Sequence, residues 1–93
     1  MLKVNEYFDG NVKSIAFQTS EYPATVGVMA PGDYEFGTSA IEYVTVVSGV
    51  MRVKLPGENA FREYNPYDTF IVPKESRFQL KISADAAYVC LYK

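Results

Sequence analysis

The side chains available for chemistry in this sequence are carboxylates, hydroxyls and a few cations, because none of its 93 residues is a histidine. A transition-metal site built on imidazole is therefore excluded, and one carboxylate with a hydroxyl is too poor a ligand set for zinc or iron. The single thiol, Cys90, has no histidine to activate it, so we expect a small buried side chain and not a nucleophile. The chemistry that remains is hydrogen bonding and stabilisation of charge.

Charge and composition exclude several classes of protein. The net charge is −2 and no block of like charges appears, so a nucleic-acid backbone is not the expected partner. No apolar run reaches the roughly 18 residues of a membrane span, and the amino terminus MLKVNEYFDG lacks the apolar region of a signal peptide. A single cysteine cannot form an intramolecular disulfide. We therefore expect a soluble, cytoplasmic protein without membrane contact.

The elements that must position any site are predicted to be β-strands. Short runs of β-branched and aromatic residues recur, each bounded by Gly, Pro, Asn or Asp, which is typical of an all-β sandwich or barrel. Nine strands are predicted, at Val12–Phe17, Thr25–Met29, Asp33–Phe36, Tyr43–Ser48, Val50–Leu55, Phe61–Tyr64, Thr69–Val72, Arg77–Ile82 and Ala87–Tyr92. No helical periodicity, repeat or linker interrupts them, so residues 1–93 are expected to form a single domain.

The last predicted strand is apolar on both faces. By alternation, Tyr88, Cys90 and Tyr92 share one side, and Val89 and Leu91 share the other. We expect this strand to be buried on both faces, covered either by two sheets or by a second subunit. An exposed edge strand this apolar would otherwise pair with strands of other chains and aggregate. A twofold homodimer is the simplest way to bury it.

Around Glu42 the sequence resembles the cupin family, small double-sheet barrels whose first motif is G(X)5HXH(X)3,4E(X)6G. Glu42 and Gly49 match the end of this motif. Counting back from Glu42, the two histidine positions fall on Phe36 and Thr38, and Gly32 lies two residues too close. The resemblance therefore keeps the carboxylate and the glycine of the motif but not its imidazoles.

The second cupin motif, G(X)5PXG(X)2H(X)3N, is weaker still. A count that begins at Tyr67 places Pro73 at the proline of the motif. The second glycine, the histidine and the asparagine are replaced by Glu75, Phe78 and Ile82. The resemblance implies an all-β, cupin-like double-stranded β-helix, or jelly-roll barrel, that has lost its metal.

A closer resemblance covers nearly the whole chain. The fragments NEYFDG, VKSIAF, VGVM, PGDYEF, TVVSG, IVP, SRF and YVCLY, in this order, are similar to the small cupin-like family of pyrimidine/purine nucleoside phosphorylases. The resemblance implies phosphorolysis, in which inorganic phosphate and a purine or pyrimidine nucleoside give ribose 1-phosphate and the free base. It also implies a homodimer that uses no metal and no organic cofactor.

Such a reaction needs donors for phosphate, a group for the sugar hydroxyls and a flat wall for the base. Glu42 is the best single candidate for the sugar, because its motif position points inward. A carboxylate can accept hydrogen bonds from two ribose hydroxyls or stabilise a cationic sugar. The alternative is a surface carboxylate at the start of a strand. Thr38 and Tyr34 lie on the same side of the preceding strand as further candidates, or are ordinary strand residues.

Tyr88 and Tyr92 could form the wall for the base, although tyrosines that alternate along a strand are usually core residues. Phosphate is harder to place, because the chain has no glycine-rich phosphate loop. Lys13 and Arg77 are the cations inside family-like segments, and arginine is the better bidentate clamp. Ser76 could add a donor. Solvated strand positions are the alternative for both cations.

Three functions follow from these observations. The first is the phosphorylase, and the second is a non-catalytic cupin-like protein that binds a sugar or nucleoside. The third, a metal-dependent cupin enzyme, is opposed by the absence of histidine. The residues permit the first two equally, so the resemblance alone favours the phosphorylase.

Overall fold

The computed structural model describes residues 1–93, and every regular element in it is a β-strand. No helix is present that could cross a membrane. The strands are β1 (Lys3–Tyr7), β2 (Val12–Gln18), β3 (Pro23–Met29), β4 (Gly32–Gly37), β5 (Glu42–Ser48), β6 (Met51–Lys54), β7 (Arg62–Tyr64), β8 (Thr69–Val72), β9 (Arg77–Ile82) and β10 (Ala86–Tyr92). The all-β prediction is confirmed.

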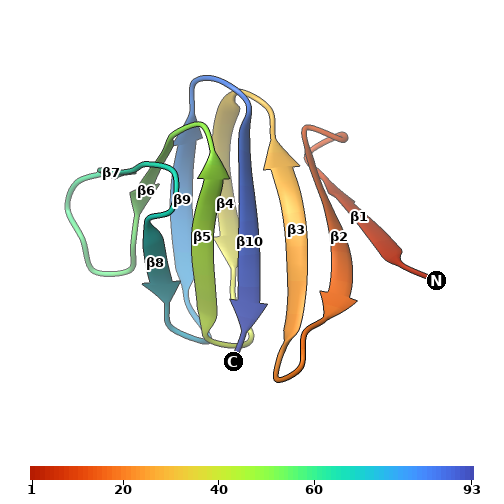
Figure 1. Ribbon diagram of the computed structural model, residues 1–93. Coiled ribbons are helices and arrows are strands. Elements are labelled where there is room, and N and C mark those ends of the chain that lie inside the picture. The colour runs from red at the N-terminus through yellow and green to blue at the C-terminus, as the bar shows by residue number, and fades with distance from the viewer.

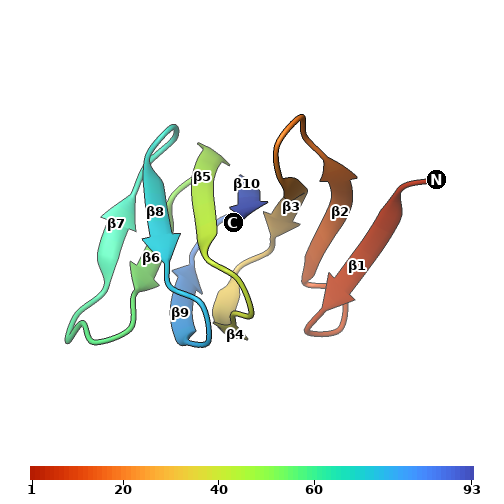
Figure 2. The same ribbon diagram turned by 90° about the horizontal axis from the view of Figure 1, so that it is seen from below.

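The strands form two antiparallel sheets that face each other (Figure 1). The larger sheet has six strands in the order β1-β2-β3-β10-β5-β8, and the smaller sheet has four in the order β4-β9-β6-β7. Seen end-on, the two layers enclose a barrel-like interior, and β1 and β2 extend beyond the smaller sheet (Figure 2). The chain therefore has one interior, enclosed between the sheets.

All nine predicted strands overlap observed ones, and Thr69–Val72 and Arg77–Ile82 match to the residue. Strand β1 was not predicted, and its residues KVNEY are mostly exposed. This strand pairs only with β2, from Lys3 opposite Ala16 to Tyr7 opposite Val12. An edge strand that buries no continuous apolar face leaves no period-2 hydrophobic pattern to detect.

Inward-facing residues of both sheets build the core. Met51 and Val53 of β6 and Val46 of β5 are fully buried, and Leu80 of β9 is 1 % exposed. Their neighbours along each strand point outward, as the alternation in Met51-Arg52-Val53 predicts. Burial of these apolar side chains is the main force that holds the two layers together.

The edge position expected for the last strand is wrong. Strand β10 is not at an edge, because it lies between β3 and β5 and pairs with both. Its outer side chains, Val89 and Leu91, are half-buried within the single chain, because no second sheet of the same chain packs on that face. The inner residues Tyr88 and Cys90 are buried as expected.

Candidate active site

A cavity of about 260 Å³ lies between the two sheets. Eleven of its fifteen lining residues are hydrophobic, which is typical of a site for a small organic molecule. The lining residues are Tyr7, Ser14, Met29, Phe36, Gly37, Ser39, Glu42, Val44, Met51, Phe70, Phe78, Leu80, Tyr88, Cys90 and Tyr92.

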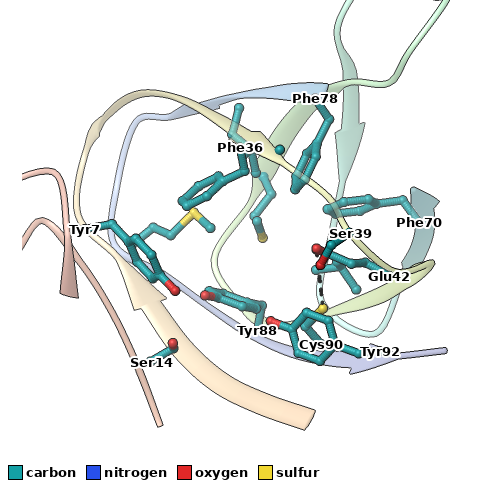
Figure 3. A pocket seen from close by; sticks show the side chains of 15 residues that line it. Tyr7, Ser14, Phe36, Ser39, Glu42, Phe70, Phe78, Tyr88, Cys90 and Tyr92 are labelled. Carbon is teal, nitrogen blue, oxygen red and sulfur yellow. Dashed lines mark hydrogen bonds between the residues drawn. The ribbon is translucent and has the colours of Figure 1, made fainter. Parts of the chain in front are cut away.

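Glu42 is the one charged side chain in the wall of this cavity (Figure 3). It is the first residue of β5 and pairs with Tyr92 on one side and Val72 on the other. Cys90 donates a hydrogen bond from Sγ to Glu42 Oε1, at 3.6 Å. Burial raises the pKa of the Glu42 carboxyl, and the bond from Cys90 opposes this. The carboxylate is therefore partly desolvated, which strengthens its interaction with any ligand that reaches it.

Hydroxyl groups make up most of the remaining polar surface. On the inner face of β10, Tyr88 is 8 % exposed, and Tyr92 forms a 3.1 Å hydrogen bond with Thr25 between the two hydroxyls. Burial raises the pKa of Tyr88 to about 12. Burial likewise raises the pKa of Cys90 to about 12. At neutral pH the phenols and the thiol are therefore protonated and can donate hydrogen bonds.

The wall opposite these hydroxyls is aromatic. Phe36 of β4 and Phe78 of β9 stack with ring centroids 6.0 Å apart, and Phe70 of β8 lies 6.2 Å from Phe78. Tyr7 meets Phe36 edge to face at 5.7 Å. The cavity thus has an aromatic wall from the smaller sheet and the edge strand β8, and its polar groups come mainly from the other strands of the larger sheet.

The residues at the cupin metal positions do not fit a metal ion. Phe36 and Phe78, which stand at two of the histidine places, offer only carbon atoms. Thr38, at the third, uses its hydroxyl to donate to the Pro73 carbonyl at 2.7 Å. No group of three or more His, Cys, Asp or Glu side chains is gathered anywhere in the structure. A metal ion at Glu42 would find only the protonated Cys90 thiol beside the carboxylate.

A shallow polar groove adjoins the cavity. It is lined by Gly37, Thr38, Ser39, Glu75, Ser76 and Arg77, and two of these residues, Gly37 and Ser39, also line the cavity. The Ser76 hydroxyl donates to Pro73 O at 2.6 Å, so it shares this acceptor with Thr38. The Thr38 bond joins the β4–β5 loop to the β8–β9 loop, whereas the Ser76 bond lies within the β8–β9 loop. Arg77 is the cation of the groove, and its only partner is Glu35, at 3.5 Å.

Comparison with known proteins identifies the family. The sequence model of a family described as pyrimidine/purine nucleoside phosphorylase matches residues 2–92. The chain belongs to this family. A relative of the same name from Pseudomonas putida (strain W619) is 59% identical, and the match covers 100% of this chain and 99% of that protein. Another, from Hahella chejuensis (strain KCTC 2396), is 59% identical over 99% of each chain. The family predicted from the sequence is confirmed.

Solved structures place this phosphorylase-family chain in the same fold. A protein of unknown function from Vibrio parahaemolyticus has a TM-score of 0.96 at 42% identity, and the match covers 100% of this chain and 99% of that one. An RmlC-like cupin from Shewanella frigidimarina has a TM-score of 0.76 at 16% identity, covering 98% and 82%. The predicted cupin-like barrel is confirmed.

Within this family member, the cavity and groove bring together six of the eight predicted site residues. Glu42, Tyr88 and Tyr92 line the cavity, while Thr38, Ser76 and Arg77 line the groove. The other two lie elsewhere. Tyr34 is a core residue whose hydroxyl donates to Ala30 O at 2.6 Å. Lys13 points outward from β2 and pairs with Glu6 at 3.5 Å. We remove both from the candidate site.

Three polar residues of the cavity were not predicted, namely Tyr7, Ser14 and Ser39. Tyr7 comes from β1, the strand that the sequence analysis missed. Ser14 lies in β2, two residues after Val12 and on the same inward face. Only the order of the strands in the sheet shows that this face borders the cavity. Ser39 lies in the loop before β5, three residues before Glu42. Its closeness in sequence to the motif carboxylate was the one signal that could have found it.

Proposed function

We propose that this protein is a nucleoside phosphorylase that transfers the pentosyl group of a purine or pyrimidine nucleoside to inorganic phosphate. The observation that carries the proposal is full-length identity of 57–59% with relatives named as such enzymes. The cavity supports the proposal chemically, since it combines a desolvated carboxylate with an aromatic wall.

We further propose that residues 1–93 act as one domain, in the cytoplasm. The buried free thiol of Cys90 is compatible with this reducing compartment.

Glu42 is the proposed catalytic residue. Cleavage of the N-glycosidic bond develops positive charge on the ribose as the base leaves. A carboxylate with few protein partners can accept hydrogen bonds from two ribose hydroxyls and stabilise that charge, because the surrounding wall is largely apolar. Since the residues at the cupin metal positions offer no ligand set, we propose that the chain's own groups carry out the reaction.

The polar groove is the proposed entry for phosphate. Arg77 extends from the start of β9 beside the backbone that joins Thr38 and Ser76. Its side chain is 74% exposed, and its ion pair with Glu35 is therefore weak enough to exchange for an oxyanion. Guanidinium binds phosphate oxygens bidentately, which fixes both position and charge. Thr38 and Ser76 support the loops here, since both hydroxyls already donate to Pro73.

Replacing Arg77 by alanine is expected to raise the KM for phosphate by about tenfold, because charge-assisted hydrogen bonds contribute about 1.5–3 kcal/mol. The KM for the nucleoside should change far less. Steady-state kinetics with phosphate and uridine varied separately measure both. Arg52→Ala is the matched control, since Arg52 is an exposed arginine of β6 outside cavity and groove. An equal loss for both substrates, or no loss, would place the phosphate elsewhere.

A non-catalytic binding protein is the second candidate. The cavity contains no cation, and the Ser76 hydroxyl, one of the three predicted phosphate donors, already donates to Pro73 O. The deciding experiment is release of uracil from uridine and hypoxanthine from inosine by EDTA-treated protein, with and without phosphate, followed by chromatography. Phosphate-dependent release of both bases supports the phosphorylase. No release from folded protein supports a binding role, and release without phosphate indicates a hydrolase.

We propose that the chain forms a homodimer through the outer face of the larger sheet. Ile15, Val26 and Val89 lie in one row across β2, β3 and β10. Ile15 and Val26 are 42% and 44% exposed, and other large apolar side chains of the sheet surround them. Monomeric proteins rarely expose a contiguous apolar surface of this kind. A second copy, related by a twofold axis, would bury it.

The variant Val26→Glu should therefore shift the protein from dimer to monomer, because a carboxylate would be buried without a partner in an apolar interface. Size-exclusion chromatography with light scattering, at several protein concentrations, measures the change. Arg52→Glu, on the outer face of the smaller sheet, should leave the mass unaltered. A wild-type monomer at high concentration, or a variant that remains dimeric, would contradict this interface.

A further inference from the structure

The two ends of the polar cavity wall differ in chemistry (Figure 3). At one end Glu42 lies beside Ser39. At the other end the side chains of Tyr7, Ser14 and Tyr88 point toward one another, and they present hydroxyl groups without a charged side chain among them. A ligand that spans the cavity would therefore meet a carboxylate at one end and hydroxyls at the other.

The position of the groove sets the direction of a bound nucleoside. Gly37 and Ser39 line both the groove and the cavity, so an anion held near Arg77 would reach the cavity at the Glu42 end. When phosphate attacks the anomeric carbon in line, it lies on the side opposite the leaving base. With the ribose at Glu42, the base must occupy the end formed by the hydroxyls.

We infer that Tyr7, Ser14 and Tyr88 form the subsite that binds the nucleobase, with the base against the ring of Phe36. This inference rests on the proposed phosphorylase function. A hydroxyl can donate or accept a hydrogen bond and rotates to suit its partner. The same three groups can therefore bind the exocyclic and ring atoms of a purine or a pyrimidine. The aromatic ring adds stacking, which depends little on the identity of the base.

The backbone positions the tyrosine at the centre of this subsite. Gly27 of β3 pairs with Tyr88 of β10, and a Cβ atom at Gly27 would lie 2.5 Å from Tyr88 Oη. The phenol thus lies across Gly27, with its hydroxyl directed toward β2 and the Ser14 side. Burial keeps its pKa high, so it remains a donor at neutral pH. The position of the Tyr88 hydroxyl is therefore fixed by the sheet, not by a flexible loop.

Tyr7 closes the subsite at its solvent side. It is 43% exposed and lies at the end of β1, where its ring contacts Phe36. The next residue, Phe8, adopts φ 53 and packs its ring 5.0 Å from that of Tyr34. The β1–β2 turn is thereby attached to β4 through aromatic contacts. A base bound between Tyr88 and Phe36 would be covered by the Tyr7 ring.

The test measures binding of parts of the substrate separately. Wild type, Tyr7→Phe and Ser14→Ala are titrated calorimetrically with hypoxanthine, uracil and ribose 1-phosphate, and kcat/KM is measured for inosine and uridine. Each variant should weaken binding of the free bases by about 2- to 10-fold, as expected for loss of one hydrogen bond. Affinity for ribose 1-phosphate should be unchanged. Tyr67→Phe is the matched control, because Tyr67 is 82% exposed and lies outside the cavity.

The outcomes separate this inference from the proposed function. Loss of base affinity in the variants supports the subsite even if wild type releases no base, which would overturn the phosphorylase alone. Phosphorolysis by wild type with unaltered base affinity in both variants would overturn the subsite and leave the function intact. An equal loss of affinity for bases and ribose 1-phosphate would also overturn it, because the hydroxyls would then act only on the shape of the cavity.

Discussion

Replacing Glu42 by glutamine is expected to lower kcat/KM for inosine and uridine at least about tenfold, with the fold intact. Glutamine keeps the size of the side chain but removes the charge, so the variant loses charge-assisted hydrogen bonds worth about 1.5–3 kcal/mol. The loss should be large because the carboxylate lies in a mostly apolar wall, where it is poorly screened. Steady-state kinetics at saturating phosphate measure it.

The pH dependence gives a second signature of the same group. Burial raises the pKa of Glu42, so its protonation should lower kcat/KM at a higher pH than an ordinary glutamate would. The activity is present above this raised pKa and is lost as the pH falls through it. Glu42→Gln should abolish this acidic limb of the pH profile, whereas a residue that only supports the fold would leave the limb in place.

Stability should change in the opposite direction. Because the folded pKa is raised, the folded protein retains the proton longer than the unfolded chain as the pH increases. The stability contributed by the protonated carboxyl is fully present below the unfolded pKa and is lost as the pH rises through the folded pKa. The free energy of unfolding of Glu42→Gln, relative to wild type, should therefore increase across that window.

Glu63 provides the matched control for these measurements. It is an exposed glutamate of β7, outside both the cavity and the groove, so Glu63→Gln should leave the kinetics and the acidic limb unaltered. Circular dichroism would establish that both variants are folded. Unchanged kcat/KM in folded Glu42→Gln would remove this residue from the site and leave the phosphorylase without its proposed catalytic group.

The strands were predictable from the sequence because their signal is local. Alternation such as Met51-Arg52-Val53 depends only on neighbouring residues and on which face is buried. Strand β1 was missed because it buries almost nothing of its own, and its position follows from pairing with β2. The edge position expected for β10 was wrong for a related reason, because apolar residues on both faces do not reveal which strands pair with it. An apolar side chain such as Val89 does not reveal whether anything covers it.

The site was predictable only where a motif or one strand determined it. Glu42 followed from the cupin spacing, and Tyr88 and Tyr92 followed from alternation within β10. Ser14 and Tyr7 join them through the pairing of β2 with β3 and of β1 with β2, which brings distant segments to one wall. Such non-local pairing leaves no trace in the spacing of the residues themselves.

The backbone keeps the cupin pattern at positions where the residues have changed. Tyr67 and Glu75 stand where the second motif has glycines, and both adopt positive φ, 75 and 55. Residues other than glycine have a steric cost in this region of φ, so the turns before and after β8 must be held by their surroundings. The loop bonds from Glu75 N to Thr38 O and from Tyr67 N to Val46 O supply that support.

Gly49 is the motif position where the structure leaves no room for another residue. It adopts φ 80 at the corner where the chain leaves β5 in the larger sheet for β6 in the smaller one. A Cβ atom there would lie 2.6 Å from the Asp85 carbonyl oxygen and 3.0 Å from Ala86 Cα. Both are backbone atoms beside the start of β10, so relief requires the strand itself to move.

Gly49→Ala is therefore expected to lower the free energy of unfolding by about 3 kcal/mol, from left-handed strain of about 1–2 kcal/mol plus overpacking of about 1–3 kcal/mol. In a domain of this size, that corresponds to a fall in Tm of roughly 12 °C or more. Gly57→Ala separates the two causes, because Gly57 has φ 82 but no atom within 4 Å of the added Cβ. It should lose only the strain, about 1–2 kcal/mol. Equal losses in the two variants, measured by urea denaturation, would mean that the contact with Asp85 costs nothing. The motif glycine would then be required by its φ alone.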